Sequence, residues 1–210
     1  GLLKGRRQSS EAALKYSVYG AGTAGIMLYG ISLVVGLTNT AHIPTLAASL
    51  AQQLPNMPAS EVTVLALGGL MLGVGLAFKL SAVPFHFWAP DTYEGAPTPV
   101  TAFLSVASKA GGFVGMVLMV FLAFPLARDV YRPFLWVLAA LTMTIGNLVA
   151  LKQTNIVRML AYSSVSQGGF ILMPLAVMAS GDAGEAALKS VVIYLLIYAF
   201  SNLGAFAVII

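Results

Sequence analysis

Two lysines stand inside apolar sequence that is long enough to cross a bilayer twice. Lys79 and Lys109 lie between Leu65 and Phe124, each surrounded by uncharged residues. An ammonium group at the centre of a membrane helix costs about 2.5 to 3.5 kcal/mol even on a lenient insertion scale, so it usually faces the protein interior and has a function. Burial favours the neutral form of a lysine and a nearby carboxylate favours the charged form. We therefore interpret both lysines as candidate proton carriers.

The segment between the two lysines carries four prolines and most of the nearby polar groups. Residues 62–94 would form one straight helix of about 50 Å, which exceeds the roughly 30 Å of a hydrocarbon core. Pro84 removes a helix hydrogen bond and disfavours helical geometry at Val83, so we expect a break just after Lys79. Backbone groups freed inside a membrane need protein or water as partners. We expect Pro84 and His86 to line a wet path at this break.

Lys109 belongs to the next predicted span. That span begins near Thr98 and Pro99, which places Lys109 about 15 Å along the helix and close to the membrane midplane. Small neighbours such as Ser105 and Gly112 permit close helix packing. The alternative, in which the side chain extends to the surface, requires a long reach from the midplane. We expect Lys109 to face the inside of the bundle.

A later predicted span is rich in hydroxyl and amide groups. It carries Tyr162, Ser163, Ser164, Ser166 and Gln167, of which Ser163, Ser166 and Gln167 are our candidates for lining the path. Such side chains either join helices by hydrogen bonds or hold water. Asp91 and Glu94 lie in the proline-rich linker, which we expect to be an ordered and partly packed loop. They have two interpretations, a proton funnel or ordinary capping acids, and we favour the second.

Composition defines the class of protein. The 210 residues are 59% hydrophobic and 9% charged, whereas a soluble domain has about 25% charged residues. The sequence has no cysteine, so this chain supplies no thiolate ligand for a metal or cluster. The net charge of +4 is spread along the chain and indicates no nucleic-acid site. We predict one all-α transmembrane domain over residues 1–210, an internal fragment of a longer protein.

About six stretches have the roughly 20 apolar residues that a membrane helix needs. They cover roughly residues 12–36, 62–83, 99–125, 133–151, 157–178 and 186–210. A short amphipathic helix is expected near 46–54, on the membrane surface. Five Lys and Arg residues lie on the N-terminal side of the bundle and three on the other. The positive-inside rule then places the N-terminal side in the cytoplasm.

Three stretches carry a resemblance to a known family. The chain is similar to the antiporter-like subunit N family of NADH-quinone oxidoreductase, respiratory complex I. The similar stretches begin at Glu11 (Glu-Ala-Ala-Leu-Lys-Tyr), at Val83 (Val-Pro-Phe-His-Phe-Trp-Ala-Pro-Asp-Thr-Tyr-Glu-Gly-Ala-Pro-Thr-Pro-Val) and at Asn147 (Asn-Leu-Val-Ala-Leu-Lys-Gln-Thr-Asn-Ile-Val-Arg). The resemblance implies about fourteen spans in the whole protein. It also implies that Lys79, Lys109 and Lys15 correspond to functional lysines of the family. It places the acidic partner of Lys79 outside this chain.

The resemblance also implies a function. It implies proton translocation through buried lysines and water, coupled to electron transfer in other subunits, in a bacterial inner (plasma) membrane. The expected partners are sister antiporter-like subunits, other membrane subunits, lipid and a peripheral redox arm that holds FMN and iron-sulfur clusters; the chain itself would hold no cofactor. The alternatives are a subunit of a multi-subunit cation/proton antiporter, a ferredoxin-linked or hydrogenase relative, and a structural scaffold. In the complex I interpretation the chain is part of a translocase and performs no redox chemistry.

Overall fold

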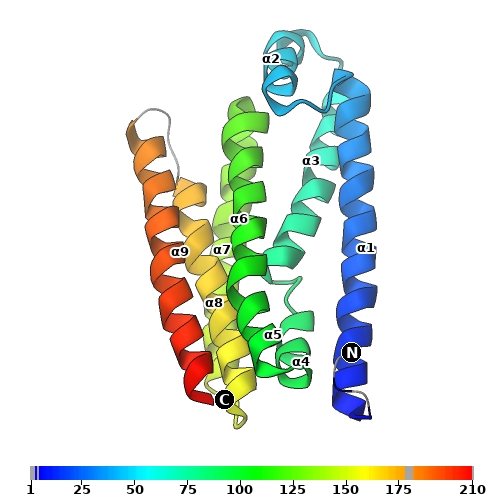
Figure 1. The fold of residues 1–210 in the computed structure, drawn as a ribbon. Coiled ribbons are helices and arrows are strands. Elements are labelled where there is room, and N and C mark those ends of the chain that lie inside the picture. The colour runs from blue at the N-terminus through cyan, green and yellow to red at the C-terminus, as the bar shows by residue number, and fades with distance from the viewer. Residues whose placement is uncertain (1–2, 4, 178–181, 210) are drawn as a thin grey trace.

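The apolar stretches of the sequence fold as helices that lie side by side (Figure 1). The computed structural model describes residue 3, residues 5–177 and residues 182–209, and only the backbone of Arg128, Asp182 and Ala183. The long helices and their short companions are α1 (Arg7–Thr38), α2 (Ile43–Gln53), η1 (Leu54–Asn56), α3 (Ala59–Leu80), α4 (Trp88–Gly95), α5 (Thr98–Phe103), η2 (Leu104–Ser108), α6 (Lys109–Val117), η3 (Leu118–Ala123), η4 (Pro125–Ala127), α7 (Arg128–Ala150), α8 (Ile156–Val177) and α9 (Asp182–Ile209).

Six helices in the described ranges are long and apolar enough to cross a membrane. They are Arg7–Thr38, Ala59–Leu80, Thr98–Ala123, Asp129–Ala150, Ile156–Val177 and Gly184–Ile209. The expected all-α bundle with six spans is therefore confirmed. The first helix begins five residues before the expected position, because its polar first turns continue the helix beyond the apolar stretch.

The short helix α2 lies at one end of the bundle and links α1 to α3 (Figure 1). Leu46 and Leu50 are buried, and they lie one turn apart on the same face. The expected short amphipathic helix is confirmed, and it begins earlier in the sequence than expected; its place on the membrane surface stays a prediction. The N-terminal end of α1, helix α4 and the C-terminal end of α9 lie at the opposite end of the bundle.

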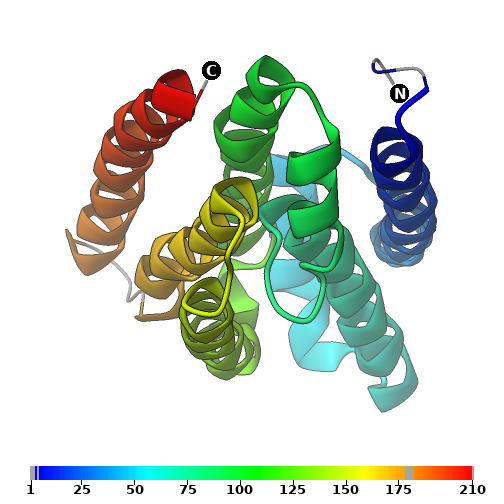
Figure 2. The same cartoon turned by 90° about the horizontal axis from the view of Figure 1, so that it is seen from below.

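Helix α8 lies at the centre of the bundle, whereas α1 and α9 lie at opposite sides of it (Figure 2). Ile171, Leu172 and Leu175 of α8 are completely buried. By contrast, large apolar side chains such as Leu28 of α1 and Phe200 of α9 are 63% and 80% exposed. Apolar surface of this extent fits contact with lipid or with other membrane helices. The chain is a multi-pass membrane protein.

Helices α1 and α3 approach each other closely through glycine. A Cβ added to Gly30 would lie 2.6 Å from the carbonyl oxygen of Gly68, which is closer than non-bonded atoms can come. Small residues at such crossings allow the two backbones to touch. The contact fixes α3, and with it Lys79, against α1.

The helix that carries Lys79 breaks where the sequence predicts. Helix α3 ends at Leu80, Ser81 adopts a left-handed conformation with φ 55°, and the next helix begins at Trp88. The peptide bond between Val83 and Pro84 is cis. The expected break near 79–84 is confirmed.

The segment after the break is a helix, so the expectation of a loop there is wrong. Trp88–Gly95 forms α4, and Trp88, Thr92 and Tyr93 are among its buried residues. Pro90 lies in its first turn, where a helix needs no N–H group, so this proline does not interrupt the helix. The expected order and partial packing of this segment are confirmed.

Protein groups satisfy the backbone that the break exposes. The Val83 N–H donates to Oγ1 of Thr142 on α7 at 3.0 Å. The indole of Trp88 donates to the carbonyl oxygen of Phe78 at 3.0 Å, at the end of α3. Thr142 lies on a different helix and Trp88 lies just beyond the break, so protein groups supply the partners that backbone inside a membrane requires. These bonds fix the end of the helix that carries Lys79.

Candidate functional site

Lys109 is completely buried at the start of α6. Its Nζ donates to the carbonyl oxygen of Ser164 at 2.5 Å and to Oγ of the same residue at 2.7 Å. No carboxylate pairs with this ammonium among the residues that the structure describes. A buried charge without a counter-ion is costly, whereas a buried neutral amine is much less so. The expectation that Lys109 faces the inside of the bundle is confirmed.

Hydroxyl groups from three helices surround the Lys109 contact. Oγ of Ser164 lies 2.7 Å from the hydroxyl of Tyr198 on α9 and 3.3 Å from that of Tyr93 on α4. The Tyr198 hydroxyl donates to the carbonyl oxygen of Ser105 at 3.0 Å, so its single hydrogen is in use and Ser164 donates to it. A directed series of hydrogen bonds therefore runs from Lys109 through Ser164 and Tyr198 to Ser105.

Local sequence explains how these groups meet. The residues just before Lys109, Leu104–Ser108, form a π-helical turn, and such turns are frequent at functional sites. Ser105 lies in this turn, and its Oγ accepts from Nδ2 of Asn202 at 2.6 Å. Asn202 and Tyr198 lie four residues apart, on one face of α9. The polar face of α9 is thereby turned toward the lysine.

Helix α6 brings Lys109 next to the segment that carries Lys79. A Cβ added to Gly112 would lie 3.0 Å from the Cβ of Lys79 and 3.1 Å from Cδ2 of Leu80. Gly112 follows Lys109 by three residues, so both lie on the same face of α6. The stem of Lys79 is therefore about one helical turn away from Lys109 along this contact.

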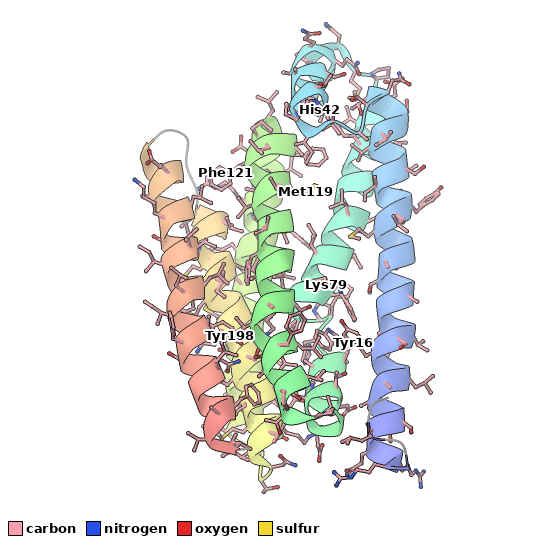
Figure 3. The ribbon with its side chains drawn as sticks, in the orientation of Figure 1. Tyr16, His42, Lys79, Met119, Phe121 and Tyr198 are labelled. Carbon is pink, nitrogen blue, oxygen red and sulfur yellow. The ribbon has the colours of Figure 1, made fainter. Side chains whose placement is uncertain are left out.

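Lys79 differs from Lys109 in its surroundings. It is exposed and lines a groove of about 260 Å³ together with Tyr16, Ser17 and Gly75, between α1 and α3. Figure 3 shows Lys79 near the middle height of the bundle, with Tyr16 lower on the α1 side. Within the described ranges its ammonium has neither a hydrogen bond nor an ion pair. The acidic partner that the resemblance implies stays a prediction.

A network of ion pairs joins three helices at the end of the bundle near the N-terminus. Lys15 of α1 contacts Glu11 at 2.7 Å and Asp91 of α4 at 2.6 Å. Arg158 of α8 contacts both Asp91 and Glu94 at 2.8 Å. Partial burial alone would raise the pKa of Asp91, but the hydrogen bonds from Lys15 and Arg158 outweigh this and lower that pKa. Asp91 lies in the first turn of α4, and both Asp91 and Glu94 pair with cations, so the choice between structural acids and a proton funnel stays a prediction.

The remaining candidate residues are not gathered in one place. His86 is buried beside Phe87 and Tyr162, with ring centroids 4.7 and 6.3 Å apart. Ser166 is buried and donates to the carbonyl oxygen of Met143 on α7 at 3.4 Å.

Two further candidates from the same helix, and the proline of the break, have different surroundings. Gln167 accepts a hydrogen bond from Tyr194 of α9, and Ser163 is half-buried. Pro84 lies in the break. The path-lining role of these residues stays a prediction. Three or more metal-ligating side chains do not gather anywhere in the described part of the chain.

Sequence reasoning did not predict which residues contact Lys109. Ser164 lies between two predicted candidates, but only the rotation of α8 decides which of these serines points at α6. Tyr198 and Asn202 carried a usable signal, because two polar residues four apart in an apolar helix share one face. The partners of Asp91 lie 76 and 67 residues away in the sequence, which no local pattern predicts.

The fold and the site define a polytopic membrane protein with a broken membrane helix and intramembrane lysines, one of them sealed inside the bundle. The chain belongs to the family described as "NADH:quinone oxidoreductase/Mrp antiporter, TM", whose model matches residues 1–210. It is 47% identical over 210 residues to NADH-quinone oxidoreductase subunit N 1 of Koribacter versatilis, covering 100% of this chain and 40% of that protein. The chain thus spans less than half the length of this relative.

Solved structures are similar as well. Respiratory complex I from Thermus thermophilus with bound aureothin contains a chain 35% identical to this one, with a TM-score of 0.76 over 99% of this chain and 42% of that chain. The Mrp complex from Dietzia sp. DQ12-45-1b gives 26% identity and a TM-score of 0.80 over 94% of this chain and 34% of that chain. The fold is therefore shared by complexes of two kinds.

Proposed function

We propose that the chain is part of a proton-translocating membrane subunit of an NADH-quinone oxidoreductase, in which Lys79 and Lys109 carry protons. The observation that carries the proposal is the sealed position of Lys109, whose ammonium has only the neutral oxygens of Ser164 as hydrogen-bond partners in the described part of the chain. In such a place an amine that releases its proton costs less free energy than an amine that stays permanently charged. The family membership and the relative from Koribacter versatilis support the assignment.

In the proposed mechanism Lys79 and Lys109 act in sequence. Lys79 takes up a proton in the open groove beside α1, and Gly112 holds its stem against the helix of Lys109. Water at the break completes the transfer from one amine to the other. The two oxygens of Ser164 stand where a counter-ion would otherwise be needed and orient the Lys109 amine. Tyr198 accepts the hydroxyl hydrogen of Ser164 and so keeps the lone pairs of that hydroxyl free for the amine. Lys15 has a different position, in the ion-pair network at the end of α1.

The proposal includes the setting of the chain. We place the N-terminal end of the bundle in the cytoplasm of a bacterial cell, because basic residues gather there: Arg6 precedes α1, Lys152 lies between α7 and α8, and Arg158 at the start of α8 pairs with α4. The proposed partners are other membrane subunits, including sister antiporter-like subunits, and a peripheral redox arm with FMN and iron-sulfur clusters. The chain would take part in a translocase without performing redox chemistry of its own.

A second candidate is a cation/proton antiporter subunit. The structural similarity to the Mrp complex from Dietzia favours it. The relative from Koribacter versatilis favours the oxidoreductase instead, at 47% identity against 26%. The two candidates make opposite predictions about coupling, because proton movement in the oxidoreductase stops when quinone reduction is inhibited and in the antiporter it follows the cation gradient.

The test is Lys79→Met in the full-length subunit within its assembled complex. Methionine keeps an apolar stem against Gly112 and removes the titrating amine, so assembly should be normal while proton translocation falls at least tenfold. Lys189→Met is the matched control, because Lys189 is 69% exposed and pairs only with Glu185 in the described part of the chain. Translocation by Lys79→Met at the level of the control would refute the role.

A further inference from the structure

The turn that precedes Lys109 departs from α-helical geometry at one buried carbonyl. In a regular α-helix the N–H of Lys109 would donate to the carbonyl oxygen of Ser105, four residues earlier. It donates to the carbonyl oxygen of Val106 instead, at the end of the π-helical turn Leu104–Ser108. Ser105 is completely buried. Its carbonyl oxygen, released from its α-helical partner, needs another partner inside a membrane.

Helix α9 supplies partners for both polar groups of Ser105. The hydroxyl of Tyr198 donates to its carbonyl oxygen at 3.0 Å, and Nδ2 of Asn202 donates to its Oγ at 2.6 Å. That Oγ in turn donates to the carbonyl oxygen of Ala102 at 2.7 Å. Tyr198 and Asn202 are only 6% and 8% exposed, whereas Phe200 between them is 80% exposed. The buried face of α9 therefore meets the π-helical turn at a single residue.

Asn202 has no direct contact with the proton-carrying group. Among the described residues, its printed partner is Ser105, and the hydrogen bonds of the Lys109 amine go to Ser164. An amide in an apolar membrane helix is unfavourable unless it bonds across to another helix. The bond to Ser105 meets this requirement. Any effect of Asn202 on Lys109 must then pass through the π-helical turn.

The π-helical turn decides which way Lys109 points. It holds one residue more than an α-helical turn, and one residue corresponds to about 100° of rotation at 3.6 residues per turn. Ahead of the turn, Thr101 donates to a backbone carbonyl of α4 at 3.0 Å. Behind it, Gly112 packs closely against Leu80 of α3. These two contacts and the bonds from Lys109 to Ser164 coexist because the extra residue is in place.

A second π-helical turn of the same span is bonded in a similar way. Tyr131 of α7 donates from its hydroxyl to the carbonyl oxygen of Val120, in η3, at 3.1 Å. Val120 follows Lys109 by eleven residues, which is about 16 Å along a helix. A tyrosine hydroxyl from a neighbouring helix thus bonds a carbonyl in both of these turns. The turn before Lys109 has the amide of Asn202 in addition.

We propose that Asn202, together with Tyr198, positions Lys109 by holding Leu104–Ser108 in its π-helical form. Asn202 is a positioning residue, since it acts on Ser105 and affects the amine through the helix alone. The inference rests on the proposed function in one respect, that Lys109 carries a proton. Without the two bonds from α9 the turn relaxes to the more common α-helical form. The amine then turns away from α8.

The form of the turn tests the inference independently of transport. Asn202→Leu combined with Tyr198→Phe removes both bonds from α9 and keeps the approximate shape of each side chain. An electron cryomicroscopy map of the assembled complex with this double variant should show Leu104–Ser108 without its π-helical turn. Tyr131→Phe is the control, because it removes the corresponding bond from the other π-helical turn and should leave Leu104–Ser108 unchanged.

Both results of the map are decisive. Loss of the π-helical turn in the double variant, with the control unchanged, supports the hold from α9, and persistence of the turn overturns it. If the double variant does not assemble, Asn202→Leu alone is measured with the same criterion. The map does not depend on proton movement, so a failure here differs from a failure of Lys79→Met.

Two substitutions of Asn202 test the role in transport, because hydrogen bonding and packing predict opposite orders. Leucine has the branched shape of asparagine without its donor, whereas glutamine keeps the donor and changes the shape. Asn202→Leu should lower proton translocation per assembled complex at least threefold, and Asn202→Gln should exceed it at least twofold. If Asn202 only fills space, the leucine variant matches the native protein and the glutamine variant is the weaker.

Any smaller difference between the two variants, or the reverse order, would overturn the positioning role. If either variant does not assemble, Ser105→Ala takes their place, since it removes the hydroxyl that Asn202 bonds. Ser105→Ala should then show the same threefold fall relative to Ser108→Ala, a matched control in the same turn. Equal translocation by these two variants would overturn the role as well.

Discussion

Lys109→Arg separates two roles that a buried cation can have. If Lys109 hands a proton onward, the side chain must spend time neutral. If it only supplies a fixed positive charge to Ser164 and Tyr198, a guanidinium supplies that charge as well. The structure favours the first role, because Lys109 is completely buried and has no counter-ion among the described residues.

The size of the effect follows from the two functional groups. A guanidinium has a pKa above about 12, so neutralising it at pH 7 costs at least about 7 kcal/mol, at 1.36 kcal/mol per pKa unit. An unperturbed lysine amine has a pKa of about 10.4, so neutralising it at pH 7 costs roughly 4.6 kcal/mol. Burial in general can lower the pKa of an amine by about 3 to 5 units and so reduce this cost. Proton transfer through the arginine variant should therefore be slower by orders of magnitude. Imidazole titrates near neutrality, so Lys109→His should keep partial activity.

The assay is proton translocation into vesicles that contain the assembled complex, normalised to the amount of complex. We expect Lys109→Arg to be about as impaired as Lys109→Ala and Lys109→His to exceed both. Lys152→Arg, in the exposed loop between α7 and α8, controls for the substitution itself and should match the native protein. High translocation in Lys109→Arg, with Lys109→His no better than Lys109→Ala, would refute proton exchange at this position.

Three further outcomes are expected. Ser164→Ala should lower translocation several-fold in assembled complex, because the buried amine loses its hydroxyl partner; activity equal to the native level would contradict the positioning role. Thr142→Val leaves the buried N–H of Val83 unsatisfied, so it should lower stability by about 1 to 3 kcal/mol, whereas the exposed Thr63→Val should change it by less than about 0.5, as measured by thermal unfolding of the subunit. Asp91→Asn should cost about 1 kcal/mol at pH 7. Because the pKa of Asp91 is lowered in the folded protein, its contribution is complete above pH about 4 and lost as pH falls further, so a difference in melting temperature that persists in strong acid would contradict the ion pairs.

The sequence predicts the features that depend on length and on local chemistry. Membrane spans follow from apolar length, and the break follows from Pro84 in a helix that is too long for the bilayer. It does not predict the helix after the break, since proline in a first turn is compatible with both helix and loop. Nor does it predict that Ser164 contacts Lys109, because α8 is buried on most sides and its periodicity does not reveal which face meets α6.

The contrast between the two lysines suggests why both are needed in the proposed mechanism. Lys79 lies in an open groove that water can reach, whereas Lys109 is sealed and, among the described residues, donates only to the two oxygens of Ser164. Gly112 brings the stem of Lys79 against the helix that carries Lys109, so a proton taken up in the groove arrives beside the sealed site. Among the described residues that site offers Lys109 no carboxylate, and a buried charge without a counter-ion is costly. Onward release of the proton therefore costs less free energy than holding it on Lys109.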